Sequence, residues 1–149
     1  MEIKDVIDRH LIITDLKCRT KDDIFQKMSQ ILLKEDYISD TKNFIKDLYV
    51  REAEGQTGIG NFIAIPHSKS SFVKKIGVVI GINQTEVPWE TLDGKGVKVI
   101  VMFVVGDNHE DAKEHLKLLS LFARKLGNDT VVEKLINSKT VDDVVDAFV

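Results

Sequence analysis

The sequence predicts one α/β domain over residues 1–149, in which a mixed β-sheet is flanked by helices. Two runs rich in valine and isoleucine, at 76–83 and 97–105, are typical of central strands. The apolar residues between Ala112 and Leu126 recur at helical spacing. The chain has 149 residues, 43% of them hydrophobic, and shows no linker or internal repeat, so it can bury one ordinary core.

The N-terminal third predicts a strand followed by two helices. The β-branched run Leu11–Leu16 is the strand. Thr20 stands three residues before Asp23, a capping-box-like helix start. One face of that helix is expected to consist of Ile24, Met28, Ile31 and Leu32. A second helix begins after Asp40 and ends near Arg51. Its inward residues are expected to be Phe44, Ile45 and Leu48.

The next segment predicts a turn that presents one histidine. A glycine-broken loop leads into Asn61–Ile65, a short apolar strand. Pro66 fixes its own φ and biases the residue before it toward extended geometry, so the strand should end there. His67 would then lie on a stiffly held turn, where loop residues often carry function.

The C-terminal half predicts two strands and three helices. Asp93-Gly94 marks a turn between the two valine-rich strands. The closing helices are expected at Glu110–Leu126, Val131–Ile136 and Val141–Phe148.

Composition excludes several classes of function. A net charge of −3 with mixed signs gives no reason to expect nucleic-acid binding. The single cysteine, Cys18, cannot form an internal disulfide, which fits a cytoplasmic protein. The N-terminus lacks the apolar core of a signal peptide, and the longest apolar runs are too short to cross a bilayer. We therefore expect no direct insertion into a membrane.

Two histidines are candidates for chemistry. Imidazole near neutral pH can act as acid, base, metal ligand or nucleophile, and His67 has the position for any of these roles. His115 belongs to a predicted inward stripe of the last long helix, made of Ala112, His115, Leu116, Leu119, Phe122, Ala123 and Leu126. Spacing alone leaves two readings open for His115: a core histidine bonded to a carbonyl, or a histidine aimed at a site. His10 and His109 have no motif around them.

Three segments carry a resemblance to a known family. They are Arg51-Glu52 with Thr57-Gly58-Ile59-Gly60 and Ile63-Ala64-Ile65-Pro66-His67; His115-Leu116-Lys117-Leu118-Leu119-Ser120; and Val87-Pro88-Trp89-Glu90-Thr91-Leu92-Asp93-Gly94. In this order and spacing the chain resembles the IIA component of the bacterial sugar phosphotransferase system (PTS), fructose/mannitol type. The third segment looks most like the fructose branch.

The resemblance implies a phosphocarrier. His67 would accept phosphate, on Nε2, from the phosphocarrier protein HPr and pass it to a cysteine of a IIB component during sugar uptake. His115 and Arg51 would lie beside it. A phosphoryl group favours a planar cation and hydroxyls as partners, so Thr57 and Ser68 are added from their proximity in sequence. Glu52 is expected to be solvated. No metal, nucleotide or other cofactor is required.

One position departs from the family pattern. The family commonly has glycine where this chain has Phe62. The aromatic ring is expected either to contact a partner or to pack against Phe72.

Two other functions compete with sugar uptake. The nitrogen-related branch of the same family shares the His67 motif, and its members regulate other proteins through their phosphorylation state. A metal-dependent hydrolase using His67 and His115 is a third class, although no HxxxH or HExxH spacing supports it.

Overall fold

The structure, a computed structural model, describes residues 2–149 and builds one sheet from five strands. These are β1 (Ile12–Leu16), β2 (Gly58–Gly60), β3 (Ile63–Ala64), β4 (Gly77–Val87) and β5 (Val97–Val104). Their order across the sheet is β1-β4-β5-β3-β2. The β1/β4 and β3/β5 pairs are parallel, whereas the β4/β5 and β2/β3 pairs are antiparallel. The predicted mixed sheet is confirmed.

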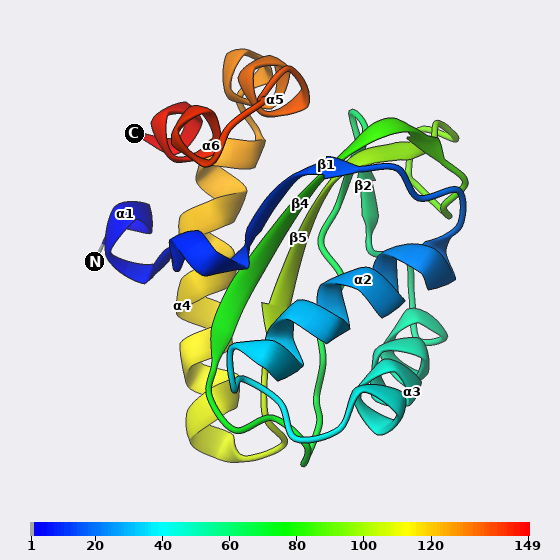
Figure 1. Cartoon of the computed structure of the whole chain (residues 1–149), viewed down its shortest axis with the longest axis vertical. Helices are drawn as coiled ribbons and strands as arrows, with labels where there is room; N and C mark the ends of the chain where they lie inside the picture. Colours follow the sequence, from blue (N-terminus) through cyan, green and yellow to red (C-terminus); the bar gives the residue numbers. More distant parts are fainter. Residues whose placement is uncertain (1) are drawn as a thin grey trace.

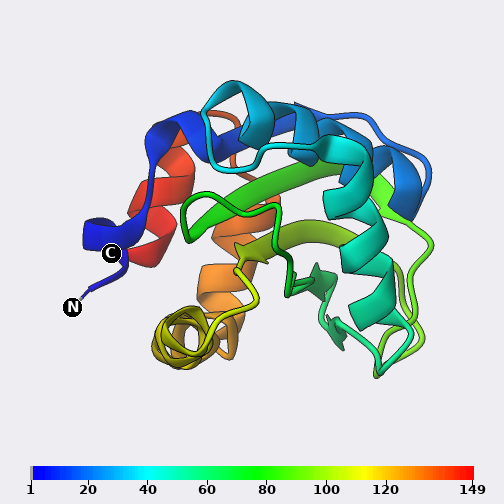
Figure 2. The same cartoon turned by 90° about the horizontal axis from the view of Figure 1, so that it is seen from below.

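Helices cover both faces of this sheet (Figures 1 and 2). They are α1 (Ile3–Val6), α2 (Lys21–Lys34), α3 (Thr41–Glu52), α4 (His109–Leu126), α5 (Asp129–Ile136) and α6 (Val141–Phe148), with a 3₁₀ turn at Arg9–Leu11. Helices α2 and α3 pack on one face and α4, α5 and α6 on the other. The predicted α/β architecture is therefore confirmed.

Strand β5 separates the two cores because side chains alternate along a strand. Ile100, Met102 and Val104 join the core under α2 and α3, while Val99, Val101 and Phe103 join the core under α4 to α6. All six are fully buried. Phe103, at the carboxyl end of the strand, therefore faces the helix that carries His115.

The starts of α2 and α3 agree with the predictions at Thr20 and Asp40, and α4 begins in the same way after Asn108. The side chains of Thr20, Asp40 and Asn108 each accept a hydrogen bond from the backbone N–H three residues on, at 3.1, 2.9 and 2.8 Å. These side chains satisfy amides that a helix start leaves unpaired.

The segment before His67 differs from its prediction. Residues 61–65 do not form one strand: Asn61 and Phe62 have φ of +56° and +67° and make the turn of a hairpin between β2 and β3. Glycine suits such a backbone best, which explains the residue that the family prefers at this position. The ammonium groups of Lys95 and Lys98 lie 5.5 and 5.4 Å from the centre of the Phe62 ring. These two ammonium groups are the cation–π partners that the structure gives the Phe62 ring. Packing against Phe72 is not among the aromatic contacts of residues 2–149, and contact with a partner stays a prediction.

Two further predictions need correction. Strand β4 continues past Asn83 to Val87, which pairs with Val97. The inward face of α4 is narrower than predicted, because Ala112, Leu116 and Ala123 are exposed. The side chains that α4 buries are Leu118, Phe122 and Leu126, with His115 and Leu119 half-buried beside them.

Within residues 2–149, no helix combines the length and the apolar character that crossing a bilayer requires.

Candidate functional site

The backbone at His67 is fixed to the carboxyl end of β5. The Phe103 N–H donates to the Pro66 carbonyl at 2.9 Å, and the Ser68 N–H donates to the Phe103 carbonyl at 3.1 Å. His67 thus forms a parallel bridge with Phe103. The structure contains the proline turn predicted from the sequence. Hydrogen bonds to β5 fix the residues just before and just after His67.

Ser68 strengthens the same attachment. Its hydroxyl donates to the Val105 carbonyl and accepts from the Val105 N–H, both at 2.8 Å, and the residue is 1% exposed. The proton of this hydroxyl is already used. The structure therefore gives Ser68 an anchoring contact rather than a free group beside His67.

Arg51 reaches His67 directly from the last turn of α3. Its Nε donates to His67 Nε2 at 2.9 Å, and its Nη1 donates to the Gly55 carbonyl at 3.0 Å. A guanidinium has no acceptor, so Nε2 must carry a lone pair rather than a proton. The proton of the neutral ring then lies on Nδ1, which is 3.5 Å from the Ile65 carbonyl.

His115, on α4, lies against His67. The two ring centres are 4.7 Å apart with planes inclined by 34°, and the His115 ring meets Phe103 edge-on at 5.3 Å. Its Nδ1 is buried and has no hydrogen-bond partner among residues 2–149. The structure does not show His115 bonded to a carbonyl in the core. It shows the His115 ring beside His67.

The site favours neutral imidazoles. Burial, then the neighbouring His115 and the Arg51 cation, lower the pKa of His67 from 6.5 to about 4. Burial, and after it Arg51, lower the pKa of His115 as well. Near neutral pH, His67 therefore offers an unprotonated Nε2, which is the form a nucleophile requires.

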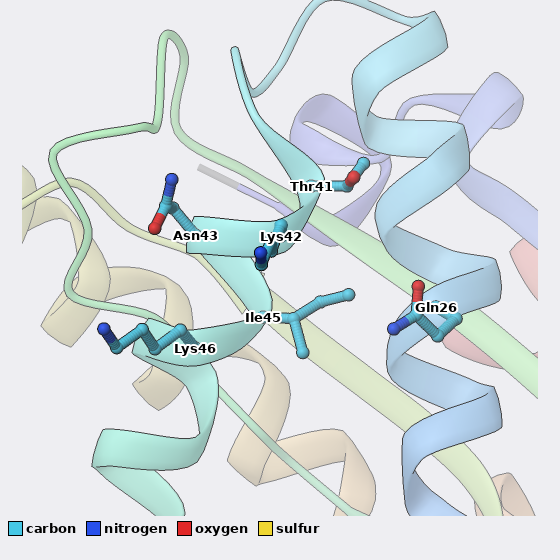
Figure 3. Close-up of a pocket in the computed structure, with 6 residues that line it drawn as sticks. All are labelled: Gln26, Thr41, Lys42, Asn43, Ile45 and Lys46. Atoms are coloured by element: carbon cyan, nitrogen blue, oxygen red, sulfur yellow. The ribbon is translucent and has the colours of Figure 1, made fainter.

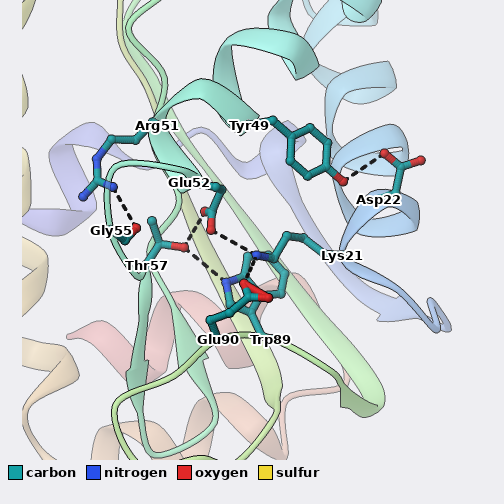
Figure 4. A network of polar contacts seen from close by, with 9 residues as sticks. All are labelled: Lys21, Asp22, Tyr49, Arg51, Glu52, Gly55, Thr57, Trp89 and Glu90. Atoms are coloured by element: carbon teal, nitrogen blue, oxygen red, sulfur yellow. Dashed lines mark hydrogen bonds and ion pairs between the residues drawn. The ribbon is translucent and has the colours of Figure 1, made fainter.

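Thr57 and Glu52 belong to a polar network beside Arg51 (Figure 4). Glu52 is not solvated, contrary to its prediction: its side chain is 8% exposed and accepts from Lys21 Nζ at 3.1 Å. The Thr57 hydroxyl donates to Glu52 and accepts from the indole N–H of Trp89 at 3.2 Å. Thr57 thus has two partners of its own, and neither is His67.

Lys21 and Glu52 were missed by reasoning from the sequence, although one signal was present. Lys21 is the first residue of α2, where the positive end of the helix dipole disfavours a cation. A lysine at that position needs carboxylates nearby, and the structure supplies Glu52 and Glu90.

Elsewhere in residues 2–149, the hollows and the remaining histidines lie apart from the cluster of Arg51, His67 and His115. A hollow between α2 and α3, lined by Gln26, Thr41, Lys42, Asn43, Ile45 and Lys46, contains no residue of the histidine cluster (Figure 3). His10 pairs with Asp8, and His109 is exposed at the start of α4.

Residues 2–149 contain no group of three or more potential metal-binding side chains. The Arg51 cation against Nε2 would also repel a metal ion there.

Comparison with known proteins gives one consistent family. The sequence model described as "Phosphoenolpyruvate-dependent sugar phosphotransferase system, EIIA 2" matches residues 5–149. The chain is 25% identical to the fructose-specific EIIABC component of Bacillus subtilis (strain 168) over 98% of its own length. It spans 23% of that relative, about a quarter of the longer protein.

Solved structures share the whole fold. The nitrogen regulatory protein IIA-Ntr from Neisseria meningitidis superposes with a TM-score of 0.88 and 26% identity, covering 99% of each chain. The complex of enzyme IIA mannitol with phosphorylated enzyme IIB mannitol from Escherichia coli gives a TM-score of 0.79 and 20% identity, over 95% of this chain and 96% of that one. Because the family model covers nearly every residue, this chain belongs to the EIIA type 2 family of the phosphoenolpyruvate-dependent sugar phosphotransferase system, whose members are phosphotransferase components.

Proposed function

We propose that this chain is a phosphocarrier that accepts a phosphoryl group on Nε2 of His67 and passes it to a cysteine of a IIB component. The observation that carries the proposal is the 2.9 Å hydrogen bond from Arg51 Nε to His67 Nε2, with His115 4.7 Å away. Two neutral imidazoles and a cation around one lone pair suit phosphoryl transfer, which depends on positioning and on charge stabilisation.

The reaction moves one phosphoryl group and leaves no net change in the carrier. The P–N bond of a phosphorylated HPr breaks as the Nε2 of His67 forms a new P–N bond. That bond then breaks as the thiolate of the acceptor cysteine forms a P–S bond. No metal or nucleotide takes part, because the donor is itself a phosphoprotein.

Arg51 has a role in each of these steps. In the structure its Nε–H occupies the lone pair that must attack phosphorus, so the guanidinium has to move aside as the donor arrives. Its planar fork then binds two equatorial oxygens of the phosphoryl group, a contact that lysine would not reproduce. The Gly55 carbonyl bound to Nη1 keeps the guanidinium close through this movement.

His115 offers a second donor. A buried ring nitrogen without a partner is less costly as an acceptor than as an N–H, so the proton of His115 belongs on Nε2. That N–H can donate to a phosphoryl oxygen on His67. The added negative charge would also raise the pKa of the His115 ring and strengthen the contact.

Thr57 and Ser68 have no place in this proposal as phosphate ligands. Each hydroxyl donates its single proton within the fold, to Glu52 and to the Val105 carbonyl respectively. Recruiting either to a phosphoryl group would break a buried hydrogen bond.

The sugar branch is our first choice for the pathway, acting on the cytoplasmic side of the membrane. The segment Val87–Gly94 looks closest to fructose components, and a fructose-specific relative from Bacillus subtilis aligns with 98% of the chain. The alternative is a regulator of the nitrogen-related branch. Its support is the likeness to IIA-Ntr from Neisseria meningitidis over the full length of both chains.

The direct test supplies phosphoenolpyruvate, enzyme I and HPr to the purified protein. We expect one phosphate per chain, labile in acid and stable in base, because phosphohistidine hydrolyses in acid. His67→Ala should accept none while remaining folded, and the matched changes His10→Ala and His109→Ala should accept as much as wild type. Label retained by the His67 variant would remove the basis of the proposal.

A further inference from the structure

Thr57 joins the two segments that meet at the proposed phosphoryl site, one through its hydroxyl and the other through its backbone carbonyl. Its hydroxyl lies in a buried position, 2% exposed, between the Glu52 carboxylate and the Trp89 indole (Figure 4). A hydroxyl has one proton to donate, and that proton goes to Glu52. The Thr57 hydroxyl therefore has no proton left to donate to a phosphoryl group.

One segment leads from Thr57 to Arg51. Glu52 is the next residue after Arg51 at the end of α3, so a carboxylate fixed by Thr57 also fixes the turn that carries the guanidinium. Lys21 Nζ binds the second oxygen of the same carboxylate at 3.1 Å and lies 4.8 Å from the centre of the Trp89 ring. The end of α3 is thus tied to α2 and to the loop after β4.

The other segment leads from Thr57 to His67. The Thr57 carbonyl accepts from the Ile65 N–H at 2.9 Å. The carbonyl of Ile65 lies 3.5 Å from Nδ1 of His67 and is the acceptor for the proton on that nitrogen. Thr57 therefore helps to set which ring nitrogen of His67 is protonated.

The ion pair in this network depends on its geometry. The side chains of Lys21 and Glu52 are only 14% and 8% exposed, and water can do little to replace a lost partner. Lys21 has a second carboxylate in Glu90, but the Glu52 carboxylate has no other cation among residues 2–149, so disturbing its contacts leaves a buried negative charge that the surrounding chain must move to solvate. Such a movement would begin one residue from Arg51.

We infer that Thr57 and Glu52 are positioning residues, which hold Arg51 against Nε2 of His67 through the end of α3 and the Ile65 backbone. The inference rests on the proposed phosphocarrier function of His67. It assigns Thr57 a role in the reaction without contact with phosphate. A misplacement of about 1 Å in a group near a reacting atom can cost up to about 100-fold in rate.

Thr57→Val tests the inference because valine keeps the shape and removes the hydroxyl. Two quantities are measured: the ring tautomer of His67 in the unphosphorylated protein, by ¹H–¹⁵N NMR, and the rate of phosphorylation by phospho-HPr. We expect a mixture of tautomers in place of one protonated at Nδ1, and a rate at least about ten-fold lower. Thr57→Ser should restore both.

Thr14→Val is the matched control. It makes the same chemical change on β1, where the hydroxyl donates to the Lys139 carbonyl at 2.9 Å. It should leave the tautomer and the rate unchanged. A folded Thr57→Val protein with the wild-type tautomer and rate would overturn the inference and leave Thr57 as a stabilising residue only.

Glu52→Gln serves if Thr57→Val does not fold. Its amide oxygen can still accept from Thr57, but its N–H groups face the Lys21 ammonium, donor against donor. We expect the same two readouts to change in the same direction by a smaller factor, and unchanged values in folded protein would overturn the inference. If wild-type protein takes no phosphate, the proposed function fails, while the tautomer of His67 still decides the role of Thr57.

Discussion

At the scale of residues, the central contact is the hydrogen bond from Arg51 Nε to His67 Nε2. Burial lowers the pKa of the His67 ring most, and His115 and the Arg51 cation lower it further, so the nitrogen that attacks in the proposed reaction stays unprotonated. The same cation is suited to the phosphoryl group once transfer begins. In the proposed mechanism, one side chain therefore serves both the free and the phosphorylated states of the site.

The low pKa of His67 predicts a pH-dependent loss of stability. The ring titrates near pH 4 in the folded protein and near 6.5 when unfolded, so the unfolded state takes up its proton first as the pH falls. The stability that comes from keeping the ring neutral is present above pH 6.5 and is lost between about pH 6.5 and 4. Relative to His67→Gln, wild-type protein should lose about 1–2 kcal/mol between pH 7 and 4.5, because partial exposure screens the ring.

Urea unfolding of both proteins at the two pH values measures this difference. His115 is present in both proteins, so the difference between them reports the titration of His67, including the influence of His115 on it. Parallel pH dependence of the two unfolding free energies would mean that His67 titrates normally.

Arg51→Lys keeps the charge and should still lose most of the rate. Lysine offers a point charge in place of a planar fork, so it cannot bind two phosphoryl oxygens together. We expect phosphorylation by phospho-HPr to slow by about 100-fold, the usual size of losing one oriented donor in a transition state. Arg124→Lys, on the exposed side of α4, is the control. Wild-type kinetics in the Arg51 variant would make Arg51 a structural residue.

At the scale of elements, the hairpin β2–β3 packs closely against the segment that follows β4. Gly58 lies so close to the Val87–Gly94 segment that an added Cβ would stand 2.4 Å from Thr91 Cγ2 and 2.5 Å from the Glu90 carbonyl oxygen. The Glu90 oxygen belongs to the backbone and cannot swing away. In the same segment, the indole N–H of Trp89 donates to the Thr57 hydroxyl at 3.2 Å.

Gly58→Ala should therefore destabilise the fold by about 1–3 kcal/mol, as overpacking does. Gly55→Ala is the matched control, since a Cβ at that position meets nothing within 4 Å. Its unfolding free energy should stay within about 0.5 kcal/mol of wild type. Equal stability of the two variants in urea unfolding would contradict the packing described for β2.

The elements differ in how well the sequence predicts them, for physical reasons. Long elements with a strong period, such as β5 and α4, were located to within a residue or two because many side chains share one environment. The hairpin was missed because its strands have three and two residues and its turn rests on two non-glycine residues with positive φ, Asn61 and Phe62.

The site was predictable in part. The turn at Pro66 follows from local chemistry, and the resemblance supplied Arg51 and His115. The partners of Thr57 and Ser68 depend on contacts between distant segments, as in the bond from Trp89 to Thr57, and spacing along the chain cannot give these. Charged residues are usually exposed, so the sequence alone predicts a solvated Glu52 and gives no sign of its buried partners.

At the scale of the whole molecule, the two branches of the family make different demands. A sugar-uptake carrier must release its phosphate to a IIB cysteine, whereas a regulator needs only to hold it and change partners. We expect labelled protein to lose its phosphate rapidly to a fructose-type IIB component, and the His67→Ala protein to transfer none. Label that remains on His67 with every IIB component of the same genome would favour the nitrogen-related branch.

The position of the phosphate on the chain tests the central claim most directly. Protein labelled with ¹⁵N and phosphorylated through HPr can be examined by NMR, where coupling between phosphorus and a ring nitrogen identifies the bonded atom. We predict a single phosphate on Nε2 of His67, the nitrogen that Arg51 contacts in the free protein. A phosphate on Nδ1 of His67, or on the ring of His115, would contradict the account.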